Sequence, residues 1–307
     1  MKTSDTVMGV TAIGGAAVIW GFSPVFYNAL SHVPPLDVLA HRLIWSLVLF
    51  GFVLVVQGRL RAVRDAMGTG RTFGLMLLAS VLVAVNWAIF IWAVQVGQTT
   101  QSSLGYYIYP LVAILLGRVL FAERLTTAQW VAVALVTGAV LVLVLGLGSV
   151  PTTALALAIS FSLYGVVKKY ISAGPVVSVT AEVMLMSPLA FALLWHSWHS
   201  GGAVFGGDAT SAVLLILSGP VTAVPLILFS YGSKRLAMST VGLLLYLNPT
   251  LQFSVAVFLF GELFTGWHMA AFALIWTALA IYSVSGLRQD RAARRASRAA
   301  PVSGTAV

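Results

Sequence analysis

The chain contains no cysteine, which excludes disulfides, thiolate nucleophiles and metals held by cysteine. Charge is also scarce, because charged residues make up 8% of the sequence against about 25% in an ordinary soluble domain. Hydrophobic residues make up 60%, so too few polar side chains remain to cover a surface that faces water. The composition therefore predicts a protein that is solvated largely by lipid.

Several signatures of catalysis and transport are missing too. The sequence has no Walker A motif, so ATP-driven transport would need another subunit. It has no HExxH or G-x-S-x-G motif and no paired intramembrane aspartates, which argues against an enzyme. A TVGYG-like filter and a ring of acidic residues are also absent, which argues against an ion channel. We expect a protein that is not an enzyme and that needs no cofactor and no metal.

What the sequence does contain is a series of apolar runs, each long enough to cross a hydrocarbon core of about 30 Å. Ten runs are predicted as membrane spans, at residues 7–28, 36–57, 72–96, 102–121, 127–146, 150–172, 176–198, 210–231, 238–260 and 266–287. They lack the alternation of a transmembrane barrel, so helices are expected. The first run follows a short leader, MKTSDT, and is interpreted as a span rather than a cleaved signal peptide.

The basic residues gather on one side of this arrangement. With ten spans, the two termini and every second loop share a side, and that side holds sixteen of the 17 lysines and arginines. They are Lys2, Arg59, Arg61, Arg64, Arg71, Arg118, Arg124, Lys168, Lys169, Lys234, Arg235, Arg288, Arg291, Arg294, Arg295 and Arg298. The positive-inside rule then puts both termini in the cytoplasm and explains the net charge of +9 without nucleic acid. Residues 288–307 are expected to be a disordered, topology-setting tail, with binding to anionic lipid heads as the alternative.

The two halves of the chain resemble each other. The pairs that match without a gap, at an offset of 139, are Ala84 and Ala223, Phe90 and Phe229, Tyr107 and Tyr246, Pro110 and Pro249, Phe121 and Phe260, and Glu123 and Glu262. Each half holds five spans, and this odd number makes the second half enter the membrane from the opposite side. We therefore predict an all-α integral membrane protein with ten transmembrane helices in two inverted five-helix repeats, residues 1–147 and 148–287. Inverted repeats favour a secondary transporter over a duplicated channel.

Charged residues deep in the predicted spans are the first candidates for a site. Arg42 lies about 9 Å into its helix, where a charge needs a partner or water. Three placements are open: a watery cavity that binds substrate, a return to the outer interface near Asp37, or an internal pair with Glu182. Its neighbour His41 is a candidate ion or charge-pair site, although a hydrogen-bonded or interfacial histidine is the simpler interpretation. Glu262 is a candidate proton site.

Aromatic, hydroxyl and amide side chains recur in the other spans and together suit a small, partly apolar ligand. Besides Arg42, the candidates for the cavity lining are Trp20, Ser23, Tyr27, Asn86, Trp87, Tyr106, Tyr109, Tyr164, Tyr246 and Asn248. Each one alone is equally well explained as an interface anchor or a packing residue. Pro110 and Pro249 each free a backbone carbonyl one turn earlier, so we expect them to let their helices kink and gate.

Several segments carry a resemblance to a known family. They are WGFSPVFY (20–27), HRLIWS (41–46), NWAIFIWAV (86–94), SLGYYIYP (103–110), FSLYGVVKK (161–169), AVPLILF (223–229) and Y-x-N-P-T (246–250). With ten spans and inverted repeats, they resemble the drug/metabolite transporter superfamily, EamA type, and within it the RarD branch. The resemblance covers essentially all of residues 7–287, with one departure at AER (122–124), where the family usually has GER. It implies an exporter or permease for small metabolites in the bacterial inner membrane, with a central cavity lined by both halves.

We therefore expect a secondary transporter that moves a small metabolite, amino-acid-like or drug-like, by alternating access. Its partners would be that substrate and the lipid bilayer, with no nucleic acid, and the sequence leaves monomer or homodimer open. Arg42 is the first candidate to hold an anionic group of the substrate. The alternatives are a passive facilitator of the same fold and a regulatory or interaction subunit that moves nothing.

Overall fold

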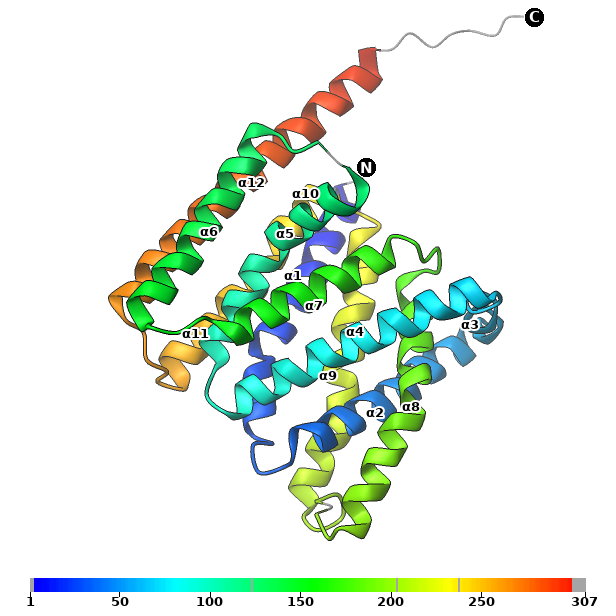
Figure 1. The fold of residues 1–307 in the computed structure, drawn as a ribbon. Helices are drawn as coiled ribbons and strands as arrows, with labels where there is room; N and C mark the ends of the chain where they lie inside the picture. Colours follow the sequence, from blue (N-terminus) through cyan, green and yellow to red (C-terminus); the bar gives the residue numbers. More distant parts are fainter. Residues whose placement is uncertain (1–2, 123, 203, 237, 300–307) are drawn as a thin grey trace, which may run out of the picture.

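The computed structural model of the chain is built from helices and the turns between them (Figure 1). It describes residues 3–122, 124–202, 204–236 and 238–299, and no strand occurs among them. The helices are α1 (Thr3–Asn28), α2 (Pro35–Val56), α3 (Leu60–Ala66), α4 (Gly70–Gln95), α5 (Thr99–Phe121), α6 (Thr127–Leu147), α7 (Thr152–Lys168), α8 (Pro175–His199), α9 (Ala209–Ser233), α10 (Met238–Leu245), α11 (Leu247–Ser254), the π-helix η1 (Val255–Leu259) and α12 (Gly266–Ala299). The predicted all-α class is confirmed.

Nine stretches of helix in the described part of the chain are long and apolar enough to cross a membrane. They correspond to nine of the ten predicted runs. The tenth run, at 150–172, contains α7, an apolar helix of 17 residues. The outer surface fits the same interpretation, because apolar side chains such as Val119 (76% exposed), Leu145 (81%) and Phe258 (82%) project from it. The chain is a multi-pass membrane protein.

Two parts of the helical pattern differ from the sequence prediction. The short helix α3 lies in the loop between the second and third apolar runs, where no helix was predicted. Helix α12 continues beyond its apolar part to Ala299, so residues 288–299 are helical where a disordered tail was expected. Residues 300–307 lie outside the described part of the chain.

Local sequence sets where the helices begin. Pro35 opens α2, and a proline suits the first helical turn because the N–H that it lacks would have no partner there. Thr69 and Thr72 form a capping box at the start of α4, and Thr126 and Gln129 form another at the start of α6. These caps satisfy backbone N–H groups that have no partner within the helix.

Asp208 caps α9 and connects it to a neighbouring loop. Its carboxylate accepts hydrogen bonds from the backbone N–H groups of Thr210 (3.1 Å) and Ser211 (2.8 Å). Hydrogen bonds from Ser211 and Thr210 lower the pKa of Asp208, which favours the charged form of the cap. The Ser211 hydroxyl also lies 2.7 Å from Nε2 of His32, in the turn after α1, so α9 begins beside the connection between α1 and α2.

The helices form a tightly packed group with one pair at its edge. Helix α2 packs against α8 and α9, α1 against α9 and α11, and α7 against α4 and α5, while α6 and α12 lie side by side at one edge (Figure 1). Small residues allow the closest approaches. A Cβ on Gly105 would lie 2.8 Å from the carbonyl oxygen of Ala154, and one on Gly219 would lie 2.5 Å from the backbone of Trp45. Such contacts are typical of helix packing in membranes, where a small residue lets two backbones meet.

The two matching prolines lie in different surroundings. Helix α5 continues through Pro110. The ninth apolar run is instead divided, because α10 ends at Leu245 and α11 begins at Leu247. The division falls one turn before Pro249, whose nitrogen cannot donate to the Leu245 carbonyl. The distortion continues into η1, which is a π-helix. Turns of this kind are rare and mark a local departure from regular helix geometry. A role of either proline in gating stays a prediction.

Candidate functional site

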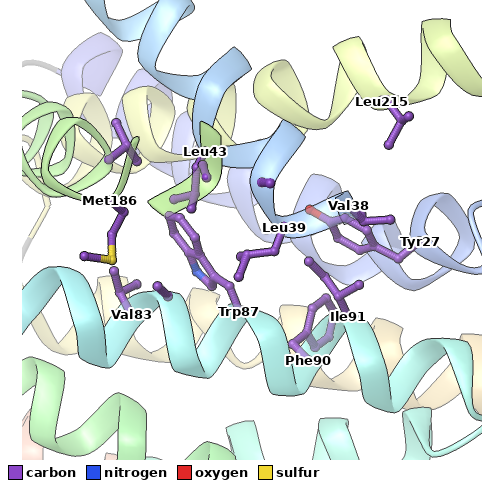
Figure 2. Close-up of a cluster of buried hydrophobic side chains, with 14 of the residues drawn as sticks. Tyr27, Val38, Leu39, Leu43, Val83, Trp87, Phe90, Ile91, Met186 and Leu215 are labelled. Atoms are coloured by element: carbon purple, nitrogen blue, oxygen red, sulfur yellow. The ribbon is translucent and has the colours of Figure 1, made fainter. Parts of the chain in front are cut away.

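Arg42, on α2, lies inside the protein and faces α1 and α4. It is 6% exposed, and its guanidinium carbon lies 4.0 Å from the centre of the Trp87 ring and 5.5 Å from that of Tyr27. Both distances are within the range at which an aromatic ring attracts a cation. Figure 2 shows Trp87 and Phe90 on α4 pointing toward Leu39 of α2 and Tyr27 of α1. The arginine is therefore packed among aromatic rings and does not return to the outer interface.

The same face of α2 carries polar atoms that have no partner. Arg42, Trp45 and Ser46 are three and four residues apart, so they share this face. The buried side-chain atoms without a hydrogen bond among the described residues include Arg42 Nε, Trp45 Nε1, Ser46 Oγ and the Tyr27 hydroxyl. No carboxylate in the described part of the chain lies within 4.0 Å of the guanidinium either. Buried polar groups are normally satisfied, so these donors are available to an incoming molecule.

Asn86 is placed differently from its predicted role as a cavity amide. Its Nδ2 donates to the Leu157 carbonyl (3.0 Å) and to the Ser160 hydroxyl (2.9 Å), both on α7. Its Oδ1 accepts from the Tyr106 hydroxyl at 3.1 Å. The side chain is fully buried and joins α4 to α7, so its polar atoms are occupied by the protein itself. It positions Tyr106, whose ring also packs on Phe90.

Three of the predicted tyrosines meet around one phenylalanine. The rings of Tyr106, Tyr109 and Tyr164 have their centres 6.0, 5.0 and 5.8 Å from that of Phe161 on α7. Tyr106 also contacts Phe90, at 5.8 Å between ring centres. Tyr106 and Tyr109, three residues apart on α5, therefore share a helical face. Phe161 was not among the predicted site residues, although its place one turn before Tyr164 is the signal that could have identified it.

Glu182 belongs to a separate buried network at the end of α7. Its carboxylate accepts hydrogen bonds from Lys168 Nζ (2.6 Å), the Ser178 hydroxyl (2.8 Å) and the Tyr164 hydroxyl (3.0 Å). Lys168 also donates to the Ser178 hydroxyl. The ion pair that the sequence suggested between Glu182 and Arg42 is therefore wrong: the carboxylate is paired with Lys168. Lys168 was counted only among the basic residues of the cytoplasmic side, although it falls within the predicted run at 150–172; the structure makes it the last residue of α7.

Glu262 binds a helix terminus. Its two carboxylate oxygens accept hydrogen bonds from the backbone N–H groups of Thr99 and Thr100, both at 2.7 Å. These are the first residues of α5, where the helix dipole favours a negative charge. The candidate proton site is thus occupied by a structural contact between the turn after η1 and the start of α5.

A second polar group lies where α1 meets α11. The Ser23 hydroxyl donates to the Trp20 carbonyl in its own helix (2.7 Å). Gln252 donates to Asn248 Oδ1 (2.9 Å) and approaches the same Trp20 carbonyl at 3.4 Å. Tyr246 packs against the cluster of apolar side chains between α5, α6 and α12. None of these four predicted residues is among the rings that contact the Arg42 guanidinium, and Gln252 was not predicted.

His41 faces away from Arg42. Its ring stacks on Phe205, in the loop between α8 and α9, at 4.8 Å between centres and an interplanar angle of 28°. It borders a cavity of about 110 Å³ between α2, α8 and α9 that Arg42 does not line. In the described part of the chain, no group of three or more histidine, aspartate or glutamate residues is arranged to hold a metal ion.

Comparison with known proteins gives consistent matches over nearly the whole chain. Residues 7–145 match the model of the EamA-like transporter family. An uncharacterized transporter of Vibrio cholerae is 39% identical over 95% of this chain and 97% of its own. Protein RarD of Streptomyces exfoliatus is 39% identical (94% and 92% covered), and protein RarD of Escherichia coli is 37% identical (95% and 99%).

One solved crystal structure has the same overall fold. It superposes with a TM-score of 0.60, covers 92% of this chain and 97% of its own, and shares 19% sequence identity. At that identity the likeness concerns the arrangement of the helices and nothing further.

Proposed function

Because the chain belongs to the EamA-like transporter family and its RarD branch, we propose that it is a secondary transporter for a small metabolite with an anionic group. It carries this metabolite, amino-acid-like or drug-like, across the bacterial inner membrane by alternating access. The aromatic rings around Arg42 contact the apolar part of the molecule.

The observation that carries the proposal is that Arg42 is buried and pairs with no carboxylate among the described residues. A guanidinium that is 6% exposed, without a carboxylate partner and with an unsatisfied Nε, destabilises the empty protein. A carboxylate or similar anion that arrives between Arg42, Tyr27 and Trp87 would supply the missing charge and accept hydrogen bonds from the guanidinium. The unpaired Tyr27 hydroxyl offers one further donor.

Alternating access would use two inverted halves of five spans each, with α7 as the sixth of ten spans. In this arrangement α1, α2, α4 and α5 correspond to α7, α8, α9 and the α10–η1 segment. The helix contacts support it: α1 packs on α9 as α4 packs on α7, and α2 packs on α9 as α4 packs on α8. Such a pairing is expected of two related halves that exchange roles between the two open states.

The contact of Glu262 with α5 would close the outer side of the transporter. It ties a turn of the second half to a helix of the first half through two charge-assisted hydrogen bonds. Glu262 follows Gly261, which has a left-handed backbone with a φ of 66°. The residue that matches Gly261 in the first half is Ala122, and its backbone is also left-handed, with a φ of 54°. Glu123, which matches Glu262, lies outside the described residues.

Glu262→Gln is expected to loosen this outer closure. A capping interaction contributes about 1 kcal/mol, so its loss would raise the open fraction about fivefold. The absence of cysteine makes the test direct. A cysteine introduced at Ser102, buried one turn into α5, would react faster with a membrane-impermeant maleimide from outside in the Glu262→Gln background. Asp208→Asn, which removes the cap of another helix, is the matched control, and equal rates in the two backgrounds would reject the role of Glu262.

The proposed orientation places both termini in the cytoplasm. The loop between α2 and α4 then lies inside, with Arg59, Arg61, Arg64 and Arg71. The turns that hold His32 and Asp208 lie outside. This assignment rests on the one-sided distribution of basic residues.

Counterflow in proteoliposomes tests the transport reaction. Vesicles loaded with amino acids, nucleosides or chloramphenicol would be supplied with each labelled compound outside, with and without a pH gradient. We expect uptake of compounds that carry a carboxylate or comparable anion, and neutral analogues of the same size to be poor substrates. Flux that never exceeds the downhill gradient would favour a facilitator. No flux of any compound by folded protein would favour the regulatory alternative.

A further inference from the structure

The cavity between α2, α8 and α9 is separate from the surroundings of Arg42. It has a volume of about 110 Å³. Its lining consists of Val33, Asp37, His41, Leu194, Ser197, Trp198, Val204, Phe205 and Leu215. A water molecule occupies roughly 30 Å³ of liquid, so the space suits an occupant of a few non-hydrogen atoms. Arg42 contacts rings on α1 and α4, whereas this cavity opens toward α8 and α9.

One wall of the cavity is polar and lacks a cation. Asp37 is 8% exposed, and one of its carboxylate oxygens accepts a hydrogen bond from the Ser197 hydroxyl at 2.5 Å. Within the described residues, no lysine, arginine or histidine forms an ion pair with it. His41 follows Asp37 by four residues on α2, is 7% exposed, and forms no hydrogen bond to any described residue through its ring nitrogens. A buried carboxylate and a buried imidazole therefore both border this partly open cavity.

The remaining walls decide which cation fits. Leu194, Val204 and Leu215 are apolar, and Trp198 and Phe205 supply aromatic rings that attract cations. Calcium and magnesium ions prefer about six or more oxygen ligands and zinc prefers about four ligands, whereas this cavity offers only Asp37, Ser197 and His41. An anion would meet the Asp37 carboxylate, and a neutral molecule would leave that carboxylate without a counter-charge.

We propose that this cavity is a binding site for a small primary alkylammonium ion. Its N–H groups would donate to the free Asp37 oxygen and to the unpartnered nitrogen of His41, and its short carbon chain would pack on Leu194, Val204 and Leu215. The site lies toward the outer ends of its helices in the proposed orientation. Binding there does not require transport, so it stands or falls independently of the proposed function.

The test uses purified full-length protein in detergent and its thermal unfolding, followed by tryptophan fluorescence. Titration with n-propylammonium chloride at constant ionic strength is expected to raise the unfolding temperature in a saturable way. Propan-1-ol has the same shape without the charge and should have no such effect. Tetrapropylammonium is too large for the cavity and should also have none. An equal effect of sodium chloride or propan-1-ol would overturn the proposal.

Two variants locate the binding. Asp37→Asn keeps the shape of the side chain and is expected to weaken propylammonium binding by roughly tenfold or more, because a charge-assisted hydrogen bond is lost. Val204→Trp leaves Asp37, His41 and Ser197 in place but fills the cavity, so binding should disappear. If Asp37→Asn fails to fold, Val204→Trp decides the question. Arg71→Gln, at an exposed position at the start of α4, should bind propylammonium like the unmodified protein. Unchanged binding by Val204→Trp would overturn the proposal.

Discussion

Replacement of Arg42 by glutamine is expected to lower the affinity for an anionic substrate by roughly thirtyfold or more. Removing one partner of a buried, hydrogen-bonded charge pair generally costs about 2–5 kcal/mol, and each 1.4 kcal/mol is about a factor of ten. Arg42→Lys keeps the charge but loses the flat guanidinium over Trp87, so an intermediate loss is expected. The measurement is the concentration dependence of counterflow, with Arg71→Gln, an exposed arginine at the start of α4, as the control.

The same position gives a second readout that separates binding from structure. If Arg42 held the fold together, its loss would destabilise the empty protein. The structure predicts the opposite sign for Arg42→Met, because the variant removes a buried charge that has no counter-ion. The gain is expected to be roughly 1 kcal/mol, since the loss of the contact with Trp87 offsets part of it. A lower unfolding temperature for Arg42→Met, with substrate affinity unchanged in Arg42→Gln, would show that the arginine is structural.

The membrane spans were predictable from the sequence because lipid imposes a simple rule. Every backbone group in hydrocarbon must be bonded inside its own helix, so the length of an apolar run sets the length of a span. The runs at 36–57 and 127–146 match α2 and α6 to within one residue. A position of Arg42 away from lipid was predictable on the same grounds, since a charge inside such a run must face protein or water, whereas the choice among its three open placements was not.

Partners across helices were harder to predict. The near-symmetric positions of Arg42 and Glu182 suggested a pair, but repeat symmetry does not decide which side chains meet. The connection along the chain does: only residues 169–174 separate α7 from α8, so Lys168 at the end of α7 reaches Glu182 on α8. Both hydrogen bonds of Glu262, and one of the three of Asn86, go to backbone groups. Every residue has such groups, so no side-chain pattern marks them in advance.

The pair of Lys168 and Glu182 leads to the second large effect, an asymmetry between its two partners. Glu182 is 1% exposed, whereas the Lys168 side chain is 23% exposed. Lys168→Met would leave a carboxylate buried with only the Ser178 and Tyr164 hydroxyls as donors. Breaking a buried pair in this way costs about 3–5 kcal/mol of folding free energy. Glu182→Gln leaves the ammonium close enough to the surface to be hydrated, so a smaller loss of about 1–2 kcal/mol is expected.

Thermal unfolding of the purified variants measures this asymmetry. The double variant tests whether an uncompensated buried charge is its cause. In Lys168→Met/Glu182→Gln no buried charge is left, so its stability should lie close to that of Glu182→Gln alone and above that of Lys168→Met. Lys234→Met, at an exposed position after α9, should change the unfolding free energy by less than about 0.5 kcal/mol. If Lys168→Met is no more destabilising than Glu182→Gln, then the ion pair is not what stabilises this part of the fold. The hydrogen bonds from the Ser178 and Tyr164 hydroxyls would then be enough to hold Glu182 in place.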